Sequence, residues 1–111
     1  MPTRCRFLVP VCYNDGRPVE PEKFITIKKT LDRQFGGYRI LAPQEGSWQG
    51  QIENTHEIEV AVNPRRIPEL RKLVLQIGRE LEQQAMYFDA PPVPSVEILD
   101  TQTGREKEDD D

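Results

Sequence analysis

The sequence predicts one α+β domain, and three observations support this prediction. Several segments alternate apolar and polar residues, which is typical of half-buried strands. Between them lie two segments whose apolar residues recur every three or four positions, which is typical of amphipathic helices. The chain has 111 residues, of which 36% are hydrophobic and 31% are charged. This length and composition suit a single core under a well-solvated surface.

Residues 4–13 predict the first strand. One side of it carries Arg4, Arg6 and Leu8. The other side is apolar and carries Cys5, Phe7, Val9, Val11 and Tyr13. The sequence NDG at 14–16 supplies turn residues that end the strand, and Pro10 indicates an edge position or a bulge.

Residues 21–35 predict the first helix. Its apolar side chains recur at helical spacing: Phe24, Ile27, Leu31 and Phe35. Pro21 suits the first turn, and Gly36 or Gly37 can adopt the left-handed conformation that ends a helix.

The middle of the chain predicts two strands joined by a long loop. Residues 38–42 form a short strand, and residues 56–63 alternate with their apolar members directed inward. We expect the polar connection 43–55, which contains Gly46, Trp48 and Gly50, to be a loop.

The last third predicts a second helix and a last core strand. Apolar residues from Ile67 to Leu81 indicate a helix from about Pro68 to about Gln84, and residues 85–89 form the strand. Residues 95–99 could add an edge strand or contact a partner. The domain then spans 1–99, and 100–111 is an acidic, disordered tail.

The order of elements predicts a ferredoxin-like βαββαβ plait, in which a four-stranded antiparallel sheet carries both helices on one face. The first and third strands are central neighbours in this arrangement. Arg4 and Arg6 should therefore lie beside Glu57 and Glu59 on the opposite face. This fold serves enzymes and binding proteins alike, so it does not identify a function.

The charge distribution disfavours nucleic acid as a partner. The net charge is −4, and residues 100–111 contain six acids and two bases. The remaining residues contain thirteen of each and are neutral, so they lack the basic field that gives most non-specific nucleic-acid affinity. The acidic tail could contact a basic protein partner or aid solubility.

Two features predict a cytoplasmic protein. No apolar run approaches the ~20 residues that span a bilayer, and the N-terminal residues do not resemble a secretory signal. Cys5 and Cys12 are seven positions apart, so on one strand they point to opposite faces and cannot form a disulfide. We expect two free thiols, with Cys12 packed rather than reactive.

The single histidine, His56, is the candidate for acid–base catalysis. Tyr13 and Glu53 are its candidate orienting partners, in a cleft beneath the 43–55 loop. One histidine and two cysteines without CxxC or HxxxH spacing predict no metal site and no cofactor. A histidine at a strand start is more often a structural hydrogen-bonding residue.

Two further groups are candidate binding residues. Trp48, with Tyr38 and Arg39, could stack on a base or a flat ligand, although Trp48 could equally anchor its loop. Arg65 and Arg66 at the start of the second helix could hold an anion, although acids of the same helix favour a mixed solvated face.

These observations favour a non-catalytic binding or accessory domain that self-associates or binds a protein through the uncovered face of the sheet. The alternative is a small acid–base enzyme that uses His56. A third hypothesis is nucleotide or RNA binding through Trp48.

Overall fold

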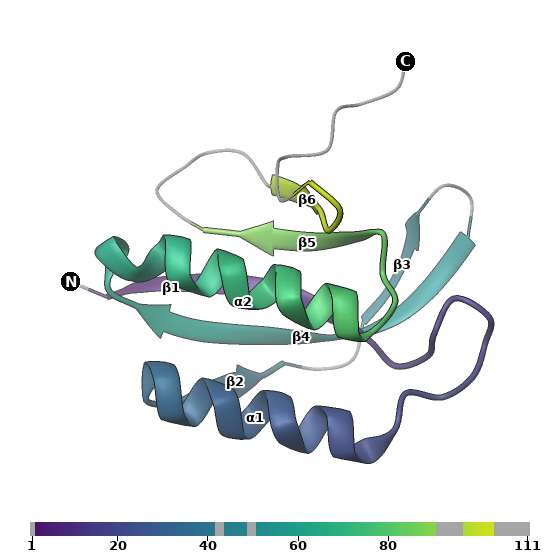
Figure 1. Ribbon diagram of the computed structural model, residues 1–111, viewed down its shortest axis with the longest axis horizontal. Helices are drawn as coiled ribbons and strands as arrows, with labels where there is room; N and C mark the ends of the chain where they lie inside the picture. The colour runs from purple at the N-terminus through teal and green to yellow at the C-terminus, as the bar shows by residue number, and fades with distance from the viewer. Residues whose placement is uncertain (1, 42–43, 49–50, 91–96, 104–111) are drawn as a thin grey trace.

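The computed structural model describes residues 2–41, 44–48, 51–90 and 97–103 (Figure 1). In the strands at 44–48, 51–53 and 97 it describes the backbone alone. The protein has the predicted α+β class, with two helices on an antiparallel sheet.

The sheet contains six described strands. They are β1 (Thr3–Pro10), β2 (Arg39–Ile40), β3 (Gln44–Trp48), β4 (Gln51–Val62), β5 (Ala85–Asp89) and β6 (Glu97–Asp100). Their order is β2-β4-β1-β5-β6, and β3 pairs with β4. All the pairings are antiparallel. The order β2-β4-β1-β5 is that of the four strands in the predicted plait, and β6 extends the sheet at the β5 edge.

The helices are α1 (Pro21–Phe35) and α2 (Ile67–Glu80), the latter preceded by a 3₁₀ turn, η1 (Pro64–Arg66). Figure 1 shows both helices on one side of the sheet. α1 has the predicted bounds. Pro21 occupies its first turn, and Gly36 ends it with a φ of 81° while its N–H donates to the carbonyl of Asp32 at 3.0 Å.

The core lies between the helices and the inner face of the sheet. Its largest fully buried side chains are Phe7, Phe88, Leu31, Leu70, Leu81 and Leu99. Each large apolar side chain that is buried stabilises the fold by about 1.5–3 kcal/mol. Leu99 belongs to β6, so this strand contributes to the core as well as to the edge.

The prediction of a loop at 43–55 is wrong. The structure places β3 and the first residues of β4 there, paired from Gln44 with Thr55 to Trp48 with Gln51. These strands consist mostly of polar residues and glycine, so no apolar alternation reveals them in the sequence. Backbone hydrogen bonding between neighbours forms the hairpin arm instead.

The second helix is shorter than expected. It ends at Glu80 rather than near Gln84, because Glu82 adopts a left-handed conformation with a φ of 59°. This turn allows β5 to begin at Ala85, as predicted. Pro10 is the last residue of central β1, beyond the residues that pair with β5, so its missing N–H costs that pairing nothing.

The C-terminal end of the fold includes Asp100 and the fully buried Thr101. The Thr101 hydroxyl donates to the carbonyl of Gln83 at 2.7 Å, and Arg79 Nε donates to the carbonyl of Thr101 at 2.8 Å. The sequence predicts that the disordered tail begins at Asp100, whereas in the structure Asp100 ends β6 and Thr101 is buried. Residues 104–111 lie outside the described part of the chain.

Candidate functional site

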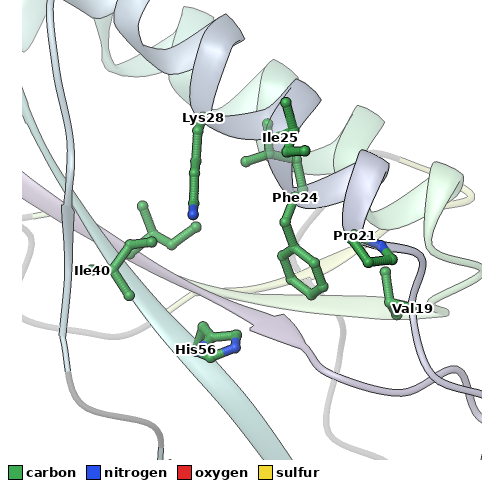
Figure 2. A pocket seen from close by; sticks show the side chains of 9 residues that line it. Val19, Pro21, Phe24, Ile25, Lys28, Ile40 and His56 are labelled. Carbon is green, nitrogen blue, oxygen red and sulfur yellow. The ribbon is translucent and has the colours of Figure 1, made fainter.

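A pocket of about 370 Å³ opens between α1 and the sheet. It is lined by Val19, Pro21, Phe24, Ile25, Ile27, Lys28, Ile40, His56 and Ile58. Its volume lies in the lower part of the range of small-molecule sites, roughly 300–1,000 Å³. Seven of these nine side chains are apolar, and the remaining two, Lys28 and His56, can carry positive charge. Figure 2 shows the side chains of α1 and of the strands meeting across this space.

Local structure explains why these residues meet. Phe24 and Lys28 are four positions apart, so they occupy one face of α1. His56 lies opposite Val9 in the ladder between β4 and β1, and Val9 is a core residue. His56 therefore faces the helices, two residues before Ile58 on the same side of β4.

Two exposed isoleucines lie at this pocket. Ile25 is 49% exposed and Ile40 is 42% exposed. Within the described chain, Tyr87 is the other large hydrophobic residue of comparable exposure. Because exposed apolar groups that gather at one concave site indicate an interaction surface, the pair points to a molecule that covers the pocket.

The imidazole of His56 has a buried polar atom without a described partner. Its Nδ1 is buried and forms no hydrogen bond with the described residues. The ring meets the ring of Phe24 edge to face, with centroids 5.7 Å apart and planes at 88°. A buried, unsatisfied nitrogen costs about 1–3 kcal/mol, and native proteins retain such atoms at few places. His56 also contributes to the lining of the pocket.

Lys28 supplies the other polar group. Its side chain extends from α1 toward Ile40 and His56 (Figure 2). No salt bridge joins it to a described residue, whereas Arg17 and Arg66 on the same molecule both pair with acids. The described lining contains no acid, so the pocket presents a positive group in apolar surroundings.

Of the two predicted partners of His56, Tyr13 makes its described contacts with other residues. Tyr13 lies in the connection before α1, where its hydroxyl donates to Glu20 Oε2 and its ring lies beneath the guanidinium of Arg17 at 4.5 Å. The hydrogen bond to Glu20 raises the pKa of Tyr13 to about 12 and lowers that of Glu20. Glu53 pairs through its backbone with Gly46 in the hairpin, and its side chain lies outside the described part.

Tyr38 and Arg39, two of the three residues predicted to stack on a ligand, lie on opposite faces of the sheet. Tyr38 packs against the core, whereas Arg39 lies on the outer face of the sheet, where its Nη1 is 3.6 Å from Glu59 Oε1. Trp48 ends β3, and its side chain is not among those described. The prediction for Trp48 therefore stays a prediction.

One arginine of the predicted anion site, Arg66, pairs with an acid of α2. Arg66 donates through Nε to Glu69 Oε2 at 2.9 Å and through Nη2 to the carbonyl of Gln34 at 2.5 Å. Arg65 is exposed beside it. The ion pair lowers the pKa of the Glu69 carboxyl. The guanidinium of Arg66 thus connects α2 to the end of α1.

The outer face of the sheet contains the predicted charge pairs. Arg6 lies opposite Glu59, with 3.3 Å between Nε and Oε2, and its Nη1 is 3.5 Å from Glu57 Oε1. Arg4 Nε is 4.0 Å from Glu59 Oε1. Glu57 is only 8% exposed and Glu59 only 5%. The prediction that these strands are neighbours with opposite charges beside each other is confirmed.

Sequence reasoning missed most of the pocket. Ile25 lies beside the predicted apolar stripe of α1 rather than on it, and such an off-stripe apolar residue is the signal that could have indicated a second contact. The sequence of the short strand at 38–42 does not by itself indicate which face Ile40 occupies. Pairing with Ile58 settles that Ile40 faces the helices.

The structure also limits other chemistry. Among the described residues, no three of His, Cys, Asp or Glu come together as a metal site. Neither described helix is long and apolar enough to cross a membrane. Cys5 is buried, but Cys12 is exposed, so the prediction of a packed Cys12 is wrong. Cys12 follows the end of β1, beyond the inward alternation that buries Cys5.

Comparisons with known proteins identify a fold rather than a family. No family model matches the chain, and no curated protein matches it. The solved structure of a phage SAM lyase in complex with S-methyl-5'-thioadenosine is similar, with a TM-score of 0.54 and 13% sequence identity. The match covers 96% of this chain and 85% of the lyase chain. At this identity the likeness supports the arrangement of elements alone.

Proposed function

We propose that the protein is a non-catalytic binding domain whose small-molecule ligand occupies the pocket between α1 and β4. The observation that carries this proposal is an apolar pocket whose lining includes Lys28 and His56, the latter with a buried Nδ1 that has no described partner. The exposed Ile25 and Ile40 add apolar surface that a ligand would cover. Burial of that surface would supply affinity at about 25 cal/mol per Å² before association costs are subtracted.

The test is a fragment screen observed by NMR on isotope-labelled protein. We expect neutral and acidic aromatic fragments to shift amide signals of residues 19–28, 40 and 56–58. Ile25→Trp should fill the entrance and abolish these shifts, whereas Lys29→Trp, an exposed site outside the pocket lining, should retain them. Shifts that gather elsewhere, or that survive Ile25→Trp, would refute the proposal.

A second candidate ligand is an adenosyl thioether or sulfonium. The support is the fold likeness to a lyase that was crystallised with S-methyl-5'-thioadenosine. Calorimetry with S-methyl-5'-thioadenosine, alongside an assay for breakdown of S-adenosylmethionine, tests it. Binding that Ile25→Trp removes would support this candidate, and turnover that His56→Gln abolishes would replace the non-catalytic proposal with an acid–base enzyme.

Self-association through the outer face, as a homodimer or with a protein partner in the cytoplasm, remains part of the proposal. Its support is the exposure of the arginines on that face, 70% for the Arg4 side chain and 66% for that of Arg39. Light scattering measures the mass. A dimer that Arg39→Glu dissociates supports the outer face, and a monomer at all concentrations removes it.

A further inference from the structure

We infer that the ligand is a flat aromatic molecule with a single negatively charged group, bound with that group between Lys28 and His56. This inference rests on the proposed function and adds the chemical class of the ligand. Two separate properties of the pocket specify the two parts of such a molecule: the shape of its apolar wall and the charge of its polar groups.

The apolar wall suits a ring. Phe24 and His56 meet nearly at right angles, so together they form an aromatic corner. A planar ring can stack on one of these faces and meet the edge of the other, which are the two favoured arrangements of aromatic pairs. A pocket of about 370 Å³ is at the small end of ligand sites, which suits a ligand of up to about three rings rather than a large cofactor.

The polar groups suit a carboxylate or a similar anion. Lys28 is the sole residue of the described lining with a permanent charge, and no described acid neutralises it. Lys23, on the same helix, instead donates to the carbonyl of Glu80 at 3.2 Å. A ligand anion would pair with Lys28, and a second oxygen could accept from an imidazole N–H of His56, whose ring lines the pocket.

A neutral ligand would use this site less well. It would leave the ammonium of Lys28 desolvated at the apolar wall without an opposite charge, and burying a charge without a partner is costly. A positively charged ligand would be repelled by Lys28. The charge of the pocket thus selects against both, and so against the neutral thioether and the cationic sulfonium of the second candidate.

The test compares two dyes that share an aromatic body. 8-Anilinonaphthalene-1-sulfonate carries one negative charge, and N-phenyl-1-naphthylamine is its neutral counterpart; both become fluorescent in apolar sites. We expect the anionic dye to bind more tightly. Lys28→Gln should weaken its binding about tenfold while changing the neutral dye less than twofold, because a hydrogen bond to a charged group contributes about that factor.

Lys29→Gln is the matched control, because Lys29 lies on the same helix but outside the lining, and it should change neither affinity. If Lys28→Gln weakens both dyes equally, or neither, the anion inference is overturned while the binding site stands. If Ile25→Trp does not weaken the binding of either dye, or if neither dye binds the wild type, the site itself is refuted.

Competition identifies the body of the ligand. 1-Naphthaleneacetate should displace the anionic dye at lower concentration than decanoate, because both carry a carboxylate but only the former is flat and aromatic. Displacement by decanoate alone would overturn the aromatic part of the inference and indicate an acyl-chain site.

Discussion

Replacement of His56 by phenylalanine should stabilise the ligand-free protein by about 1 kcal/mol. The Nδ1 atom is buried and has no described hydrogen-bond partner. Such an atom costs about 1–3 kcal/mol, and an apolar side chain of similar shape removes that cost. Phenylalanine also keeps a ring at the position that meets Phe24 edge to face.

The expected gain is at the low end of that range for two structural reasons. The His56 side chain is half-buried rather than fully buried, so part of it remains solvated in either protein. Phenylalanine is also larger, although the adjoining pocket of about 370 Å³ gives it room and avoids the strain of overpacking. For a domain of this size, 1 kcal/mol corresponds to an increase in melting temperature of about 4 °C.

Urea unfolding of the two proteins measures the change, with His56→Ala as the control. The alanine variant also removes Nδ1, but it loses the aromatic contact with Phe24, which contributes about 0.5–1.5 kcal/mol beyond area burial. We therefore expect His56→Ala to be destabilised and His56→Phe to be stabilised. A loss of stability in both variants would indicate that Nδ1 is not an unsatisfied atom, and the argument for the ligand site would lose one of its supports.

Four further predictions concern the sheet, the two cysteines and the core. Arg6→Gln should lower the free energy of unfolding by about 1.5 kcal/mol, because Arg6 contacts both buried glutamates. Arg4→Gln should lower it by less than about 0.5 kcal/mol, because the ion pair described for Arg4 is 4.0 Å long and its side chain is 70% exposed. Equal losses in urea unfolding would contradict this. A thiol reagent should modify Cys12 at once and Cys5 only on unfolding. Burial raises the pKa of the Cys5 thiol from 9.0 to about 11, so the stability that the buried thiol contributes is complete below pH 9 and is lost as the pH rises toward 11. The free energy of unfolding of Cys5→Ala should therefore fall less steeply over this pH range than that of the wild type. An identical slope in the two proteins would refute this. Gly78→Ala should destabilise the protein by about 1–2 kcal/mol although alanine has the better helix propensity, because the added Cβ would lie 2.6 Å from the side chain of the buried Met86. A melting temperature at or above that of the wild type would refute this prediction.

Local periodicity was enough to predict much of the fold. The bounds of α1 and β5 were predicted to the residue, because helical and strand spacing depend on the backbone geometry of each element alone. The ion pairs of Arg6 also followed from alternation combined with the order of strands. The pairing of residues 44–48 with 51–55 did not, because these segments have no alternating apolar residues and only pairing between neighbours defines them.

The candidate site was determined by tertiary structure. The sequence singled out His56 as chemically distinctive but associated it with Tyr13 and Glu53 rather than with Lys28 and Phe24. Which side chains surround the imidazole depends on how α1 lies against β4, and that packing is set by the whole core. A sequence therefore determines by itself which face of each element is apolar, whereas the distance between two elements, and the pocket left between them, exists only once the chain has folded.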